Sequence, residues 1–220
     1  TLTATAARLN GHGISGAGTV AVTAGGLAIT AVLGGITTDI SSYTGTDADQ
    51  ITGTLPAAGT CTINNSLTLN ADSLLNTNAS YVIVINKTLT ATAARLNGHG
   101  ISGAGNVAIT ALDATAAANL STITNTGTQT AAVSENVTFT GNLGTFTTTV
   151  ATAKTMTAAA NVVASKTVDN AGTGALAVQI GTADANVNLT TIAGTALSTI
   201  TVTENVTFIG TLDNTVKTSV

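Results

Sequence analysis

The stretch TLTATAARLNGHGISGAG occupies residues 1–18 and occurs again, without a single change, at residues 88–105. The two copies continue in register as TVAVTA and NVAITA, with Thr19 replaced by Asn106 and Val22 by Ile109. A match this close indicates the duplication of a structural unit. The sequence therefore predicts a first repeat block over residues 1–87 and a second block with an extension over residues 88–220, continuous with the first.

Shorter repeats occur within these blocks. SENVTFTG at residues 134–141 recurs as TENVTFIG at residues 203–210. Residues 64–75 also align with residues 135–146 by their turn residues and their alternation rather than by their letters. The spacing of the copies is uneven, so each block is expected to contain several turns of any repeating coil.

Short strands are predicted from alternation. In TLTATA, Leu2, Ala4 and Ala6 lie on one face of an extended chain and threonines lie on the other, which is typical of a half-buried strand. Glycine and asparagine tolerate tight corners, so LNGHGISGAG is interpreted as a turn region, and the alanine-rich residues 113–120 and 152–166 as short turns or strands. Further strands are predicted at residues 19–24, 27–32, 61–69, 81–86, 106–111, 121–126, 136–141, 145–150, 175–180, 186–191 and 198–209.

The composition favours one of two all-β architectures. Apolar residues make up 44% of the chain but aromatic residues only 2%. The core of a β-sandwich is usually filled by large side chains, whereas a narrow coil can be filled by stacked Val, Ile, Leu and Ala. We therefore expect a β-solenoid (parallel β-helix) with short strands and Gly/Asn corners, and keep tandem β-sandwich domains as the alternative.

Charge and hydropathy exclude two classes of partner. The net charge is −4 and the chain has six Lys and Arg residues, which is too few for a nucleic-acid interface. The longest aliphatic run, residues 81–85, is far shorter than the roughly 20 residues needed to span a bilayer.

The sequence offers little for catalysis, and we predict that the protein is not an enzyme. GISGAG does not have the spacing of a phosphate-binding loop. His12 and His99 are repeat equivalents, so we interpret both as surface or corner residues rather than as members of a catalytic set. Glu135 and Glu204 are also repeat equivalents, which again suggests a structural position.

Two further features concern metals and thiols. Asp47 and Asp49 form an oxygen-rich loop that is a weak calcium candidate, and no other cofactor is expected. Cys61 is the single cysteine of the chain, so it is interpreted as a small buried apolar residue rather than as half of an internal disulfide.

The tracts GISGAGTVAVT, GISGAGNVAIT and ENVTFTGNLGT resemble the repeats of bacterial autotransporter passengers and giant secreted adhesins. The resemblance implies a right-handed β-solenoid displayed at the cell surface, and it carries no site residue. We expect a non-enzymatic extracellular structural protein that pairs with copies of itself, head to tail, in a filament or surface layer.

Two other functions stay open. One is an adhesin or glycan-binding surface module. The other is an ice-binding protein, because STITNTGTQT places threonines at positions 122, 124, 126, 128 and 130 on one face of an expected strand.

Overall fold

The computed structural model describes residues 1–23, 33, 35–43, 53–54, 59–69, 73–76, 78–211 and 217–219. The chain forms two compact units. Unit 1 comprises Thr1–Ala108 and Thr122–Gln129, and unit 2 comprises Ile109–Ser121 and Thr130–Val220. Both copies of the opening stretch lie in unit 1, and the predicted division at residue 87 stays a prediction.

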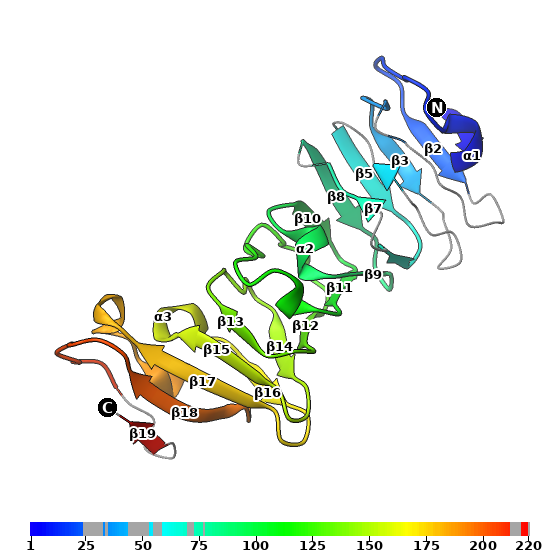
Figure 1. The fold of residues 1–220 in the computed structure, drawn as a ribbon. Helices are drawn as coiled ribbons and strands as arrows, with labels where there is room; N and C mark the ends of the chain where they lie inside the picture. The colour runs from blue at the N-terminus through cyan, green and yellow to red at the C-terminus, as the bar shows by residue number, and fades with distance from the viewer. Residues whose placement is uncertain are drawn as a thin grey trace. The chain divides into compact units, whose positions relative to one another are not determined.

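The fold is β-rich, as predicted. In unit 1, six strands lie side by side in the order β1, β2, β3, β5, β8, β10 (Figure 1). β4 and β7 form a two-stranded sheet, and β6 pairs with β9 at one end of another, larger sheet. The strands of unit 1 are β1 (Leu2–Thr5), β2 (Val20–Thr23), β3 (Ile40–Tyr43), β4 (Gly53–Thr54), β5 (Gly59–Ile63), β6 (Leu67–Thr68), β7 (Ser73–Leu74), β8 (Ala79–Ile83), β9 (Thr88–Ala91) and β10 (Gly100–Gly103).

The strand pairs of unit 1 are parallel, and each step from one strand to the next covers about 20 residues of sequence. Val20 pairs with Ile40, Ile40 with Cys61, Cys61 with Tyr81, and Tyr81 with Ile101. These five side chains are buried, so each strand contributes one side chain to a continuous apolar column. We call one such step of the chain a rung.

Two strands, β11 (Asn106–Ile109) and β12 (Gln129–Val133), contain residues of both units. In unit 2, β12, β14 and β16 pair in parallel. A second sheet has the order β13, β15, β17, β18, β19 and is also parallel. The other strands of unit 2 are β13 (Val137–Phe139), β14 (Thr147–Val150), β15 (Thr155–Ala159), β16 (Val168–Asn170), β17 (Ala175–Ile180), β18 (Leu197–Val202) and β19 (Lys217–Ser219).

The core of unit 2 repeats the arrangement of unit 1. Phe139, Ala158, Val178 and Ile200 are buried side chains at matching positions of β13, β15, β17 and β18. Apart from Phe139 the column consists of aliphatic side chains, which explains how a chain with 2% aromatic residues fills its interior.

Short helices form some of the corners, and the sequence analysis missed them. The helices α1 (Ala6–Leu9) and α2 (Ala93–Leu96) follow β1 and β9, and α3 (Ala160–Val163) follows β15. Their last residues, Leu9, Leu96 and Val163, are buried. Each helix is a single turn, too short for the amphipathic period that predicts longer helices. Within the described part of the chain, 3₁₀ turns occur at η1 (Leu112–Ala114), η2 (Thr182–Asp184) and η3 (Leu189–Thr191).

Several predicted elements require correction. Residues 121–126 form only an isolated bridge at Ile123, and residues 186–191 contain η3 rather than a strand. The strand expected at residues 186–191 is absent because the Asn188 side chain accepts a hydrogen bond from the Thr190 backbone N–H and closes a turn. Conversely, part of the predicted turn region in the second copy is the strand β10. The strand expected at residues 27–32 lies outside the described residues.

Candidate functional site

Asp47 and Asp49, the weak calcium candidates, lie outside the described residues, so the calcium interpretation stays a prediction. In the part of the chain that the structure describes, no group of three or more His, Cys, Asp or Glu side chains could hold a metal ion.

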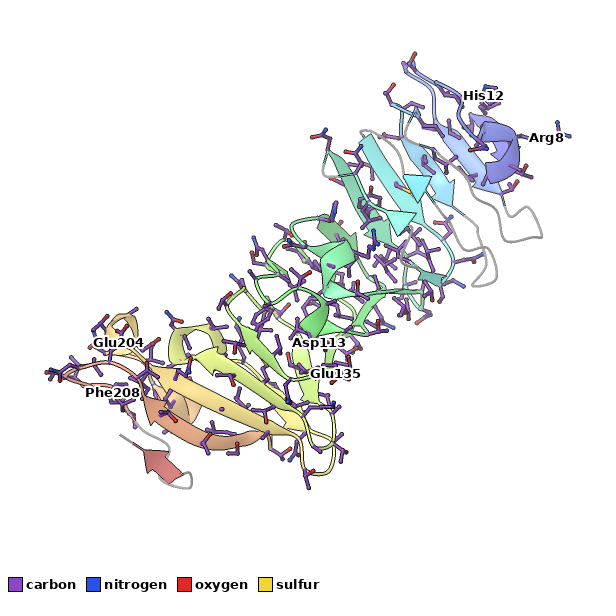
Figure 2. All side chains as sticks on the ribbon, viewed as in Figure 1. Arg8, His12, Asp113, Glu135, Glu204 and Phe208 are labelled. Atoms are coloured by element: carbon purple, nitrogen blue, oxygen red, sulfur yellow. The ribbon has the colours of Figure 1, made fainter. Side chains whose placement is uncertain are left out.

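His12 and His99 occupy the same position in identical sequences but have different environments. His12 is exposed, in agreement with the prediction (Figure 2). His99 is 8% exposed, and its ring packs edge-on against Tyr81 with centroids 6.4 Å apart. His99 is therefore not a surface residue, but it lies at a corner, between α2 and β10. Burial lowers the pKa of His99, and a hydrogen bond with the Asn76 backbone partly offsets this effect.

Cys61 is completely buried and forms no disulfide, as predicted. Burial raises the pKa of its thiol to about 12. The thiol therefore stays protonated at neutral pH, and Cys61 acts as a small apolar side chain in the core of unit 1.

Several carboxylates hold neighbouring rungs together. Oδ1 of Asp113 accepts hydrogen bonds from the backbone N–H groups of Ser134, at 2.6 Å, and of Glu135, at 3.3 Å. Oε2 of Glu204 accepts a hydrogen bond from the Thr182 backbone N–H at 2.8 Å. This hydrogen bond lowers the pKa of Glu204. Each acceptor lies about one rung away from its donor, so these carboxylates have structural contacts.

Glu135 and Glu204 differ in their partners although they are repeat equivalents. Glu135 forms an ion pair with Lys154. The residue equivalent to Asp113 in the other repeat is Thr182. The carboxylate that bridges the two rungs therefore belongs to the earlier rung in one repeat, at Asp113, and to the later rung in the other, at Glu204. The prediction of a structural position holds for both residues, with different contacts in each.

Threonine hydroxyls also connect the rungs. The Thr122 hydroxyl donates to the His99 carbonyl at 2.8 Å, and the Thr203 hydroxyl donates to the Ile180 carbonyl at 3.2 Å. Thr140 makes the same kind of bond with Ala116 at 3.5 Å. In each case the donor and acceptor are 23 or 24 residues apart. These bonds provide a structural role for threonine in this fold.

The expected array of threonines is only partly present. Residues 122, 124, 126, 128 and 130 are all exposed, but the strand β12 begins only at Gln129. Asn125 lies buried between them and donates to the Gly105 carbonyl at 2.7 Å. The row therefore follows a corner and the start of a strand rather than one strand face.

Two depressions on unit 2 have volumes of about 290 and 280 Å³. The first is lined by Asn136, Val137, Thr138, Thr155 and Thr157. The second includes Lys166, whose Nζ donates to the Gly144 carbonyl and so is already engaged within unit 2. Neither provides a combination of groups typical of a reaction centre.

The feature of the described chain that bears on stacking is the contrast between β1 and β9. Among the described residues, β1 lies at the end of its sheet and pairs with β2 on one side. Leu2 in β1 is 49% exposed, whereas Leu89, the same residue of the second copy, is completely buried. The difference arises because β9 lies between β6 and β11, which cover it from both sides.

No protein-family model, curated protein or solved structure matches this chain.

Two differences between repeat copies appear only in the structure. Nothing in the local sequence predicts that Leu2 is exposed, because the eighteen residues around it are identical to those around Leu89. The two copies of ENVTF are also alike in sequence but have different contacts.

Among the described residues, no helix is long and apolar enough to cross a membrane.

Proposed function

We propose that this chain is a non-enzymatic structural protein of the cell surface or extracellular space, built as a β-solenoid and assembling with copies of itself. Two observations support the solenoid over tandem sandwiches. The strand pairs are parallel, whereas sandwiches are built mainly from antiparallel strands. Neighbouring strands are also about 20 residues apart in sequence, as expected when each turn of a coil stacks on the previous one.

The observation that carries the proposal is the repeated parallel step of unit 1. Buried side chains follow one another on neighbouring parallel strands, at Val20, Ile40, Cys61, Tyr81 and Ile101. Because each step pairs with the next through the same kind of backbone contact, a rung of a second copy could stack in the same way.

The bonds between rungs make such an extension chemically simple. Neighbouring rungs are connected by the backbone, by threonine hydroxyls and by acceptor side chains such as Asp113. An additional rung from another molecule needs only the same types of contact, without a specialised binding pocket.

Light scattering coupled to size exclusion, followed by electron microscopy, tests self-assembly. We expect the mass to increase with concentration and elongated or layered particles to appear. A protein that stays monomeric over the accessible concentrations, with and without calcium, would refute the proposal. Glycan binding by a strict monomer would support the adhesin alternative, and thermal hysteresis with shaping of ice crystals would support the ice-binding alternative.

A further inference from the structure

A cavity of about 280 Å³ lies on unit 2, between the corner that follows β13 and the segment that begins with α3. It is lined by Gly141, Asn142, Asn161, Val162, Ala164 and Lys166. All of these residues belong to the continuously described stretch 78–211. Pockets that bind small ligands have volumes from about 300 Å³ upward, so this cavity suits a single small ligand.

The ammonium group of Lys166 is held in place at this cavity without being neutralised. Its Nζ donates a hydrogen bond to the Gly144 carbonyl, and the residue is half-buried. Lys166 forms no ion pair with any residue that the structure describes, in contrast to Lys154, which pairs with Glu135. An ammonium group has three N–H donors, so a ligand can use the other two. A fixed cation in a concave site attracts anions and binds them through charge-assisted hydrogen bonds.

Two asparagine side chains line the same cavity as this cation. Oδ1 of Asn142 accepts a hydrogen bond from the Gly144 backbone N–H at 2.9 Å, which fixes the side chain and leaves its NH₂ group as a donor. Asn161 is exposed, and its side chain makes no hydrogen bond with another described residue. Amide side chains both donate to and accept from hydroxyl groups. The lining therefore suits a ligand that carries hydroxyl groups next to its negative charge.

Asp184 is the carboxylate closest to this lining, through a contact with Asn161. It is 3% exposed. Its Oδ1 accepts from the Asn161 backbone N–H at 2.8 Å, and its Oδ2 accepts from the Gly181 backbone N–H at 3.0 Å. Backbone donors therefore satisfy both oxygens of Asp184. Lys166 is the charged residue that lines the cavity itself.

We propose that this cavity binds a sugar that carries a carboxylate, that is, a uronic acid. Lys166 binds the carboxylate, Asn142 and Asn161 bind hydroxyl groups, and the small side chains of Val162 and Ala164 contact the CH groups of the ring. The inference goes beyond the structural role proposed above. It does not depend on self-assembly, because every contributing residue belongs to one chain.

The first test is a titration of the isotope-labelled chain, followed by nuclear magnetic resonance of the side-chain amides of Asn142 and Asn161. The probes are methyl glucuronide, the matched neutral sugar methyl glucoside, and inorganic phosphate. We expect saturable shifts with the glucuronide and binding at least about tenfold weaker for the glucoside, because the glucoside lacks the partner of Lys166. Phosphate should also bind more weakly than the glucuronide, because it offers no hydroxyl groups of a sugar ring.

The second test removes the charge but keeps a donor for the Gly144 carbonyl. Lys166→Gln should weaken binding of the glucuronide by about tenfold and leave the weak binding of the glucoside unchanged. Lys154→Gln is the matched control, because Lys154 does not line the cavity, and it should bind like the unchanged chain. Asn161→Asp places a negative charge at the cavity and should abolish binding of the glucuronide. Circular dichroism shows whether each variant is folded.

The outcomes separate this site from the structural role. No saturable binding of the glucuronide, or equal affinities for the glucuronide and the glucoside, would overturn the proposal. Phosphate that binds as tightly as the glucuronide would show a general anion site instead of a sugar site. An equal loss in Lys166→Gln and Lys154→Gln would show that the cavity is not where the ligand binds. Each of these results leaves self-assembly standing, and a chain that stays monomeric leaves this site standing.

Discussion

His99 packs edge-on against Tyr81 in the interior of unit 1, with the two ring planes inclined by 76°. Nδ1 of His99 is buried and has no hydrogen-bond partner among the described residues. A protonated imidazole needs a partner for both nitrogens, so this environment favours the neutral ring. The identical sequence around His12 provides an internal comparison.

The buried histidine should make the free energy of unfolding depend on pH. The pKa of His99 is lower in the folded chain than its ordinary value of 6.5. As the pH falls through 6.5, the unfolded chain binds a proton before the folded chain does, so stability decreases toward pH 5. The contribution of the neutral His99 side chain to stability is fully present above about pH 7.5. Urea unfolding at several pH values should show this slope, with His99→Gln reducing it and His12→Gln leaving it unchanged. Equal slopes in both variants would contradict the assignment.

Leu89 and Leu2 should differ strongly when each is replaced by alanine. Leu89→Ala leaves a cavity between stacked rungs and should reduce the free energy of unfolding by about 2 to 5 kcal/mol. Leu2→Ala removes a half-exposed side chain and should cost less than about 1 kcal/mol in the monomer. Chemical denaturation at low protein concentration measures both values. Similar losses of stability in the two variants would mean that β6 and β11 do not cover Leu89.

Gly103 and Gly16 provide a second matched pair, since they are the same residue of the two copies. Both have a positive φ, which disfavours alanine by about 1 to 3 kcal/mol. At Gly103 a Cβ atom would also lie 2.3 Å from the Ile83 carbonyl oxygen, whereas at Gly16 nothing lies within 4 Å. Gly103→Ala should therefore lower the melting temperature clearly more than Gly16→Ala, as measured by circular dichroism.

Asp113 should stabilise unit 2 through its role as an acceptor. Asp113→Ala leaves the N–H groups of Ser134 and Glu135 without this partner, and we expect a loss of about 1 to 2 kcal/mol. Asp113→Asn keeps an oxygen in the same place and should recover most of that stability. If the asparagine and alanine variants are equally destabilised in urea, the charge rather than the hydrogen bond is responsible.

Alternation and composition were sufficient to predict much of the fold. The strands β2, β14 and β17 lie within predicted ranges, and the core consists of aliphatic side chains as expected. The strand expected at residues 186–191 is absent because the Asn188 side chain closes a turn. The one-turn helices α1 and α2 were missed because four residues carry too little periodicity to be recognised.

The sequence by itself determined the type of rung: short alternating strands, small apolar interior residues, and threonines and asparagines that can connect neighbouring turns. Only the tertiary structure decided which rungs are covered. Leu2 and Leu89, like His12 and His99, have the same neighbours in the chain but opposite exposure. The physical reason is that burial in a stack depends on the neighbouring rungs, which are distant in sequence.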